Sequence, residues 1–311
     1  MARRGGSLTS NRFKATLGAL IALTFLGALL VSLVAFRNYR SSRDLIEPAQ
    51  ASPLLRHPEL TGVALLRNMS FQSPDGLRLA GWYVPSKNHA AIVLTHGTNT
   101  DRSSMLPELR LLADAGFGVL AFDWPGLGDS EGEVLWDDSA RHALTAAVDW
   151  LSAREDVDAQ RIGGLGFSIG GFMMTQVAAG DRRLRAVVLE GTPTSFDAYL
   201  KLHHGRWGIL GEWPARWAIR RSGLLAAAWA PQRLIAAIAP RSLLIIGGSR
   251  DEEIPAAMER ELYSAAGEPK ALWIVPGAQH GNYAQASPAE YPRRLLTFFS
   301  GDLVSAGGTI P

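Results

Sequence analysis

The sequence of 311 residues contains no cysteine. This absence excludes disulfide bridges, a cysteine nucleophile and thiolate metal sites, and it leaves the redox compartment undecided. The chain also lacks a large excess of charge, because 31 lysines and arginines face 29 aspartates and glutamates. A net charge of +2 is too small to indicate a nucleic-acid partner. The phosphate-loop pattern Gly-x-x-x-x-Gly-Lys-Ser/Thr is absent as well, which removes one argument for nucleotide binding.

What the chain does have is the composition of a folded protein, with 47% hydrophobic and 19% charged residues. Its length suffices for one α/β domain of roughly 250 residues together with an appendage.

The appendage is expected at the N-terminus, where residues 15–36 contain neither a charge nor a proline. As a helix rising roughly 1.5 Å per residue, this segment spans about 30 Å of hydrocarbon. It exceeds the roughly 7–15 apolar residues of a signal peptide, lacks an Ala-x-Ala-like site near its end, and is apolar on all sides, unlike a core helix. We therefore predict a basic tail at 1–14, an uncleaved transmembrane anchor at 15–36 and a proline-punctuated linker at 37–66.

Basic residues flank this expected anchor on both sides. Four precede it, and the three that follow it are partly offset by Asp44 and Glu47; the seven are Arg3, Arg4, Arg12, Lys14, Arg37, Arg40 and Arg43. The balance favours a cytoplasmic N-terminus, which places the following domain outside the cytoplasm. The expected location is a membrane, with a single-pass anchor.

Residues 67–311 have the pattern of an α/β domain. Apolar and polar residues alternate in two segments, Arg67–Ser73 and Leu77–Pro85, on either side of Asp75-Gly76. This pattern predicts an antiparallel hairpin. Short apolar runs then alternate with helical segments, at 90–95, 118–122, 185–189, 242–246 and 271–275, together with the run that ends at Gly166. This alternation predicts a mostly parallel, twisted sheet with helices on both faces.

A long insertion without a strand pattern separates two of the expected strands, at about 192–240. In open α/β sheets ligands bind beyond the carboxyl ends of the strands, so an insertion there predicts a helical cap over the site. Tryptophans alternate with arginines in it. We expect the tryptophans to pack the cap onto the domain, with a membrane-facing basic aromatic surface as the alternative.

The chain is organised around Gly166-Phe167-Ser168-Ile169-Gly170, which follows an apolar run and precedes an apolar helical segment. The pattern Gly-x-Ser-x-Gly is typical of a sharp strand-to-helix turn that exposes a serine hydroxyl at the edge of a sheet. The turn also directs the backbone N–H of Ile169, at a helix N-terminus, toward developing negative charge.

A serine nucleophile needs a histidine base that is oriented by an acid. Asp251 follows the strand at 242–246, and His280 follows the strand at 271–275. Glu252 and Glu253 adjoin Asp251, and Glu190 follows another strand, so the choice of acid stays open with a preference for Asp251. His203 and His204 lie in the insertion without further ligands at metal-binding spacing, which favours polar cap residues over a metal site.

From about Asn68 to Ser300 the chain resembles an α/β-hydrolase, in particular the membrane-anchored Bem46-like and serine-aminopeptidase-like branch. The resemblance rests on the serine–acid–histidine order and on the motifs Gly81–Pro85, His96-Gly97, Asp123–Ser130, Gly166–Gly171 and the loops of Asp251 and His280.

The resemblance implies a role for each of these residues. Ser168 is the nucleophile, His280 the general base and later acid, and Asp251 the group that orients His280. The backbone N–H groups of Thr98 and Ile169 form the oxyanion hole. His96, Gly97, Gly166 and Gly170 shape the loops around it.

The implied activity is hydrolysis of carboxylic esters by acyl transfer, with a small-molecule or lipid ester as substrate and no cofactor. A peptidase or thioesterase with the same triad is an alternative that the sequence does not separate from it. A non-catalytic, membrane-anchored binding module is a further alternative, and the complete set of Ser168, Asp251 and His280 argues against it.

Overall fold

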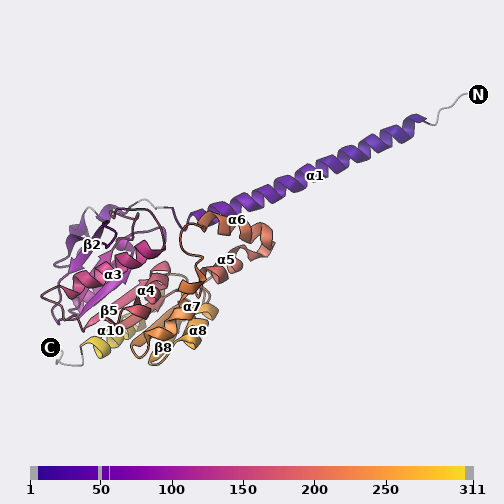
Figure 1. Cartoon of the computed structure of the whole chain (residues 1–311). Coiled ribbons are helices and arrows are strands. Elements are labelled where there is room, and N and C mark those ends of the chain that lie inside the picture. Colours follow the sequence, from indigo (N-terminus) through magenta and orange to yellow (C-terminus); the bar gives the residue numbers. More distant parts are fainter. Residues whose placement is uncertain (1–5, 48–50, 56, 305–311) are drawn as a thin grey trace, which may run out of the picture.

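The computed structural model describes residues 6–47, 51–55 and 57–304. They form an α/β domain from which one long helix, α1 (Gly6–Arg43), projects like a rod, as Figure 1 shows.

An eight-stranded sheet in the order β1-β2-β4-β3-β5-β6-β7-β8 forms the centre of the domain. The strands β1 and β2 pair as an antiparallel hairpin, β2 is antiparallel to β4, and the remaining neighbours are parallel. Their bounds are β1 Arg67–Gln72, β2 Arg78–Val84, β3 Ala91–Thr95, β4 Gly118–Phe122, β5 Ile162–Phe167, β6 Leu184–Glu190, β7 Ser242–Gly248 and β8 Lys270–Val275. The prediction of a mixed, mostly parallel sheet with an N-terminal hairpin is confirmed.

Helices cover both faces of the sheet because successive strand residues point to opposite sides. Val93 of β3 belongs to a buried cluster that includes α3 (Asp138–Ser152), α4 (Ile169–Gly180) and α8 (Ala256–Ala265). Its neighbour Ile92 belongs to a second cluster. The helices on that side are α2 (Leu106–Asp114), the short α9 (Tyr283–Ala286) and α10 (Glu290–Leu303).

The helix α1 is longer than the expected anchor at 15–36. Residues 6–14, expected as a tail, and residues 37–43, expected as the start of a linker, are helical. No proline or glycine interrupts residues 28–43, and the last turns pack against the domain, so the helix continues past the apolar segment. The rest of the expected linker contains two short turns in its described part, η1 (Pro53–Leu55) and η2 (Pro58–Thr61).

The insertion after β6 is helical, and its helix α6 packs along α1 near the C-terminal end of α1, as Figure 1 shows. Its elements are α5 (Phe196–His204), η4 (Gly205–Trp207), α6 (Ile209–Ile219), η5 (Ala227–Trp229), α7 (Pro231–Leu234) and η6 (Ile235–Ile238). The expectation that its tryptophans pack the cap onto the domain is met in part: Trp229 lies against the Arg141 guanidinium of α3, 3.9 Å from it, but none of the four is buried. Each is between 39% and 60% exposed, namely Trp207, Trp213, Trp217 and Trp229. Small residues such as Gly211, Ala215 and Ala218 are buried on α6 instead.

Candidate active site

Ser168 lies on the sharp turn between β5 and α4, where its φ of 55° is in a region that non-glycine residues rarely adopt. The backbone N–H of Ser168 donates a 2.7 Å hydrogen bond to the carbonyl of Glu190, which holds the turn against β6. Glycine is required on both sides of it. A Cβ atom at Gly170 would lie 2.3 Å from the Thr95 carbonyl oxygen, and one at Gly166 would lie 2.6 Å from the Gly170 oxygen.

Asp251 and His280 meet beyond the carboxyl ends of β7 and β8. The Nδ1 atom of His280 lies 2.8 Å from Oδ2 of Asp251, whose side chain is fully buried. The same Oδ2 accepts a hydrogen bond from the Tyr283 hydroxyl, and Oδ1 accepts from the backbone N–H groups of Glu253 and Ile254. Four donors therefore hold the carboxylate in one orientation, with Nδ1 of His280 as the protonated nitrogen.

The other acids considered from the sequence have different partners. Glu252 is exposed, and Glu253 accepts a hydrogen bond from the Tyr199 hydroxyl. Glu190 is buried, and its Oε1 lies 2.7 Å from the Tyr291 hydroxyl, which also lies 3.1 Å from Glu108. Burial, and then the neighbouring charge of Glu108, raise the pKa of Glu190 to about 8. Of these acids, the structure places Asp251 at His280.

Ser168 and His280 line one cavity of about 310 Å³. The predicted oxyanion residues Thr98 and Ile169 line it too, together with Gly97. The other lining residues are Leu45, Phe167, Pro193, Phe196, Tyr199, Glu253 and Ile254. Between the described side chains of Ser168 and His280 there is no direct hydrogen bond, as is common before substrate binds. The cavity thus joins a serine, a histidine–aspartate pair and a helix N-terminus, the groups that acyl transfer requires.

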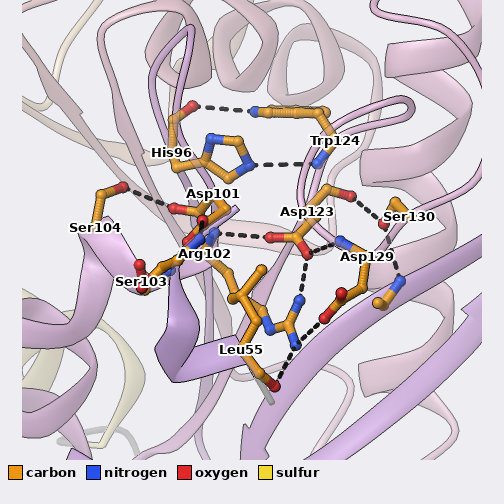
Figure 2. Close-up of polar contacts among 12 residues, drawn as sticks. Leu55, His96, Asp101, Arg102, Ser103, Ser104, Asp123, Trp124, Asp129 and Ser130 are labelled. Carbon is orange, nitrogen blue, oxygen red and sulfur yellow. Dashed lines mark hydrogen bonds and ion pairs between the residues drawn. The ribbon is translucent and has the colours of Figure 1, made fainter. Parts of the chain in front are cut away.

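His96 is buried at the start of the loop that carries Thr98. Its Nε2 accepts the backbone N–H of Trp124 at 3.3 Å, and its carbonyl accepts the Trp124 indole N–H at 3.0 Å, as Figure 2 shows. Burial lowers the pKa of His96 to about 4, so the ring is neutral at pH 7. His96 therefore holds the loop in place, as the resemblance implies.

Arg102 is a buried residue that the sequence patterns did not single out. Its guanidinium contacts the carboxylates of Asp123 and Asp129, and its backbone N–H donates to Asp123 at 2.7 Å (Figure 2). Burial raises the pKa of Asp123 to about 6 even with Arg102 beside it. The cluster ties the loops after β3 and β4 together. A buried arginine has no periodic signal in the sequence, so the motif Asp123–Ser130 included its partners Asp123 and Asp129 but did not identify Arg102.

Two further buried groups near Asp251 were also missed. One is Tyr283, whose hydroxyl hydrogen bond is described above. The other is Glu259 of α8, which is buried. Burial, and then the charge of Asp251, raise the pKa of Glu259 well above its ordinary value, which favours its neutral form.

The two cap histidines have protein partners. Nδ1 of His204 lies 2.6 Å from Oδ1 of Asn38, and its Nε2 lies 3.1 Å from Oγ of Ser42, both on α1. Nε2 of His203 lies 2.9 Å from the Glu253 carbonyl. Among the residues that the structure describes, no three histidines, aspartates or glutamates are grouped as a metal site.

Comparisons with known proteins agree with this fold. Residues 92–295 match the alpha/beta hydrolase family. The uncharacterized protein YfhR of Escherichia coli K12 is 33% identical over 68% of this chain and 72% of its own. The uncharacterized protein Rv2307c of Mycobacterium tuberculosis is 31% identical over 82% of this chain and 86% of its own.

Solved structures resemble the fold at low sequence identity. An esterase of Pyrococcus furiosus superposes with a TM-score of 0.70 and 22% identity, over 83% of this chain and 98% of its own. A membrane phospholipase A, described as a bacterial virulence factor, gives 0.59 and 18%, over 93% of this chain and 98% of its own.

Proposed function

The chain belongs to the alpha/beta hydrolase family, and on that premise we propose that it is a membrane-anchored serine hydrolase that cleaves carboxylic esters. The observation that carries the proposal is the hydrogen bond between His280 and the buried Asp251, in a cavity that also contains Ser168 on its strained turn. The family hosts many reactions, so the substrate class has to come from the site itself.

In the proposed mechanism, Oγ of Ser168 attacks the ester carbonyl carbon while Nε2 of His280 takes the hydroxyl proton. Asp251 stabilises the imidazolium that forms. The backbone N–H groups of Ile169 and Thr98 donate to the oxyanion, and donors of this kind contribute about 3–4 kcal/mol each. The alkoxide leaves with the proton from His280. Water, deprotonated by His280, then attacks the acyl-enzyme and releases the carboxylic acid and Ser168.

The apolar part of the cavity supports an ester with a hydrophobic acyl group. The cavity that contains the serine has apolar lining residues, namely Leu45, Phe167, Ile169, Phe196 and Ile254. Such a lining favours an apolar acyl chain over a charged one. The names of two structural neighbours, an esterase and a phospholipase A, point in the same direction.

The proposed location is a membrane. The described part of α1 is long and apolar enough to span a bilayer, and no residue in the apolar window of the helix is buried. The excess of basic residues before the apolar segment supports a cytoplasmic N-terminus, with the hydrolase domain on the other side.

Labelling by a fluorophosphonate tests the proposal directly. The full chain in detergent should react covalently, Ser168→Ala should not react, and His280→Ala should react at least about 10³-fold more slowly. Ser264→Ala serves as the matched control, because Ser264 is an exposed serine on α8. Turnover of p-nitrophenyl esters, thioesters and peptide anilides then ranks the leaving groups. A folded wild type that stays unlabelled in both detergent and vesicles would favour a non-catalytic binding module.

A further inference from the structure

A second cavity, of about 590 Å³, adjoins the catalytic one and shares four lining residues with it: Leu45, Thr98, Tyr199 and Glu253. One wall comes from the cap, including His203, Arg206 and Trp207. Another part of the lining comes from the end of α1 and the residues after it, namely Arg37, Asn38, Ser41, Asp44 and Leu45. The long helix is therefore part of the approach to Ser168 as well as a projection from the domain.

Specific hydrogen bonds hold this end of α1 in place. His204 of the cap bridges the buried side chains of Asn38 and Ser42, and the Trp136 indole N–H donates to the Leu45 carbonyl at 3.2 Å. Burial lowers the pKa of His204, so the ring is neutral, with the Nδ1 proton donated to Asn38 and Nε2 accepting from Ser42. A helix that only tethered the domain would not need buried polar contacts of this kind.

The cavity presents two arginines, Arg37 and Arg206, and the guanidinium of Arg206 lies 5.9 Å from the centre of the Trp207 ring. Among the described residues, neither Arg37 nor Arg206 has a salt bridge, whereas Arg40 and Arg43 on the same helix both pair with Glu47. Both arginines are exposed and line the cavity. A guanidinium binds phosphate oxygens through paired N–H donors. Asp44 and Glu253 line the same cavity, so a headgroup with an additional amine also finds a carboxylate.

The surface beside this cavity has the composition of a membrane interface. The helix α6 packs along α1 (Figure 1) and exposes Ile209, Trp213 and Trp217, with the two indoles stacked 5.8 Å apart. The Arg220 guanidinium lies 3.5 Å above the Trp217 ring. Tryptophan and arginine are the residues that favour the headgroup layer. Arg37 directly follows the apolar residues 15–36 that would cross the hydrocarbon, so the cavity lined by Arg37 lies at the depth of the lipid headgroups.

Resting on the proposed function, we propose that the substrate is a phospholipid ester that enters from the bilayer between α1 and the cap. Its phosphate is bound by Arg37 of α1 and Arg206 of the cap. Its acyl ester extends through the shared boundary at Leu45 and Tyr199 to Ser168. The end of α1 thereby forms one half of the headgroup site.

The test uses the full chain in mixed micelles of a maltoside detergent, which contains no phosphate. Three substrates are compared: dioleoyl phosphatidylethanolamine, dioleoylglycerol with the same acyl chains, and p-nitrophenyl butyrate. The double variant Arg37→Gln/Arg206→Gln should lower kcat/KM for the phospholipid, relative to the other two esters, by at least about tenfold and mainly through KM. The matched control Arg40→Gln/Arg43→Gln removes two paired arginines and should leave this ratio within about twofold of wild type.

Each other outcome is decisive. Three outcomes would contradict the headgroup site but not the proposed serine hydrolase. They are an unchanged ratio in the Arg37/Arg206 variant, an equal change in the control variant, and a wild type that cleaves p-nitrophenyl butyrate but not the phospholipid. A folded wild type that cleaves none of the three esters would instead contradict the proposed function itself.

Discussion

The loops at the carboxyl ends of the strands and the junction between α1 and the cap line adjoining cavities, but they are held together differently. The loops are fixed by buried charges: the Asp251 carboxylate accepts four hydrogen bonds, and Arg102 joins Asp123 to Asp129. The junction is fixed by a neutral histidine, His204, between two polar side chains, and by helix packing.

This difference matches the demands on the two regions. Acyl transfer needs its groups held to within a fraction of an ångström, and buried ion pairs impose that precision at a high cost if one partner is lost. The approach path that we propose for a lipid does not require that precision. The comparison predicts that substitutions in the loops have larger effects than equivalent substitutions at the junction.

The largest effect is expected at Asp251. Asp251→Asn keeps the shape of the side chain but removes the charge that stabilises the His280 imidazolium, so we expect kcat to fall about 10³–10⁴-fold with little change in KM. The measurement is steady-state hydrolysis of p-nitrophenyl butyrate by the full chain, beside a melting curve to confirm folding. Glu252→Gln, at the exposed neighbour, is the control and should be close to wild type. A similar loss in both variants would contradict the assignment of Asp251 as the triad acid.

The next largest effect is expected at Arg102. Arg102→Leu leaves the Asp123 carboxylate buried without its cation, which should cost about 3–5 kcal/mol of unfolding free energy. Because burial already raises the pKa of Asp123 to about 6, and loss of Arg102 raises it further, the carboxyl is neutral at low pH. The loss of stability should therefore be smaller below pH 5 than at pH 8.

Thermal unfolding in detergent at several pH values measures this effect. Arg78→Leu removes an exposed salt bridge to Glu131 and should change stability by no more than about 0.5 kcal/mol. A pH-independent loss in Arg102→Leu would show that packing, not the unpaired carboxylate, causes it.

A smaller effect is expected at the junction. His204→Ala removes the partner of Asn38 and of Ser42, both buried and neutral, and should cost about 1–2 kcal/mol. The loss should be local, so amide hydrogen exchange should accelerate in residues 37–47 while the strands keep their protection. His142→Ala, at an exposed histidine beside Asp75, is the control. If His204→Ala lowered the free energy of unfolding as much as Arg102→Leu does, the two regions would not differ in the way proposed.

Much of the fold and of the catalytic candidates follows from local patterns in the sequence. Apolar runs of strand length, the Asp75-Gly76 turn and the order of the segments were sufficient to predict the mixed sheet. Ser168 and His280 were identified because each directly follows a strand, and the carboxyl ends of parallel strands meet at one edge. The apolar segment at 15–36 could also be predicted from the sequence, because length and composition are properties of a contiguous stretch.

Tertiary structure decided the contacts between distant residues. It placed Asp251 rather than Glu252 at His280, although the two are neighbours in the chain, because backbone N–H groups and Tyr283 orient that carboxylate. It left Trp213 and Trp217 of α6 exposed, since small residues of that helix are buried instead. It also brought Asn38 and Ser42 to His204, more than 160 residues along the chain. Periodicity describes the backbone within one element, whereas these pairs depend on how elements pack, which no local pattern records.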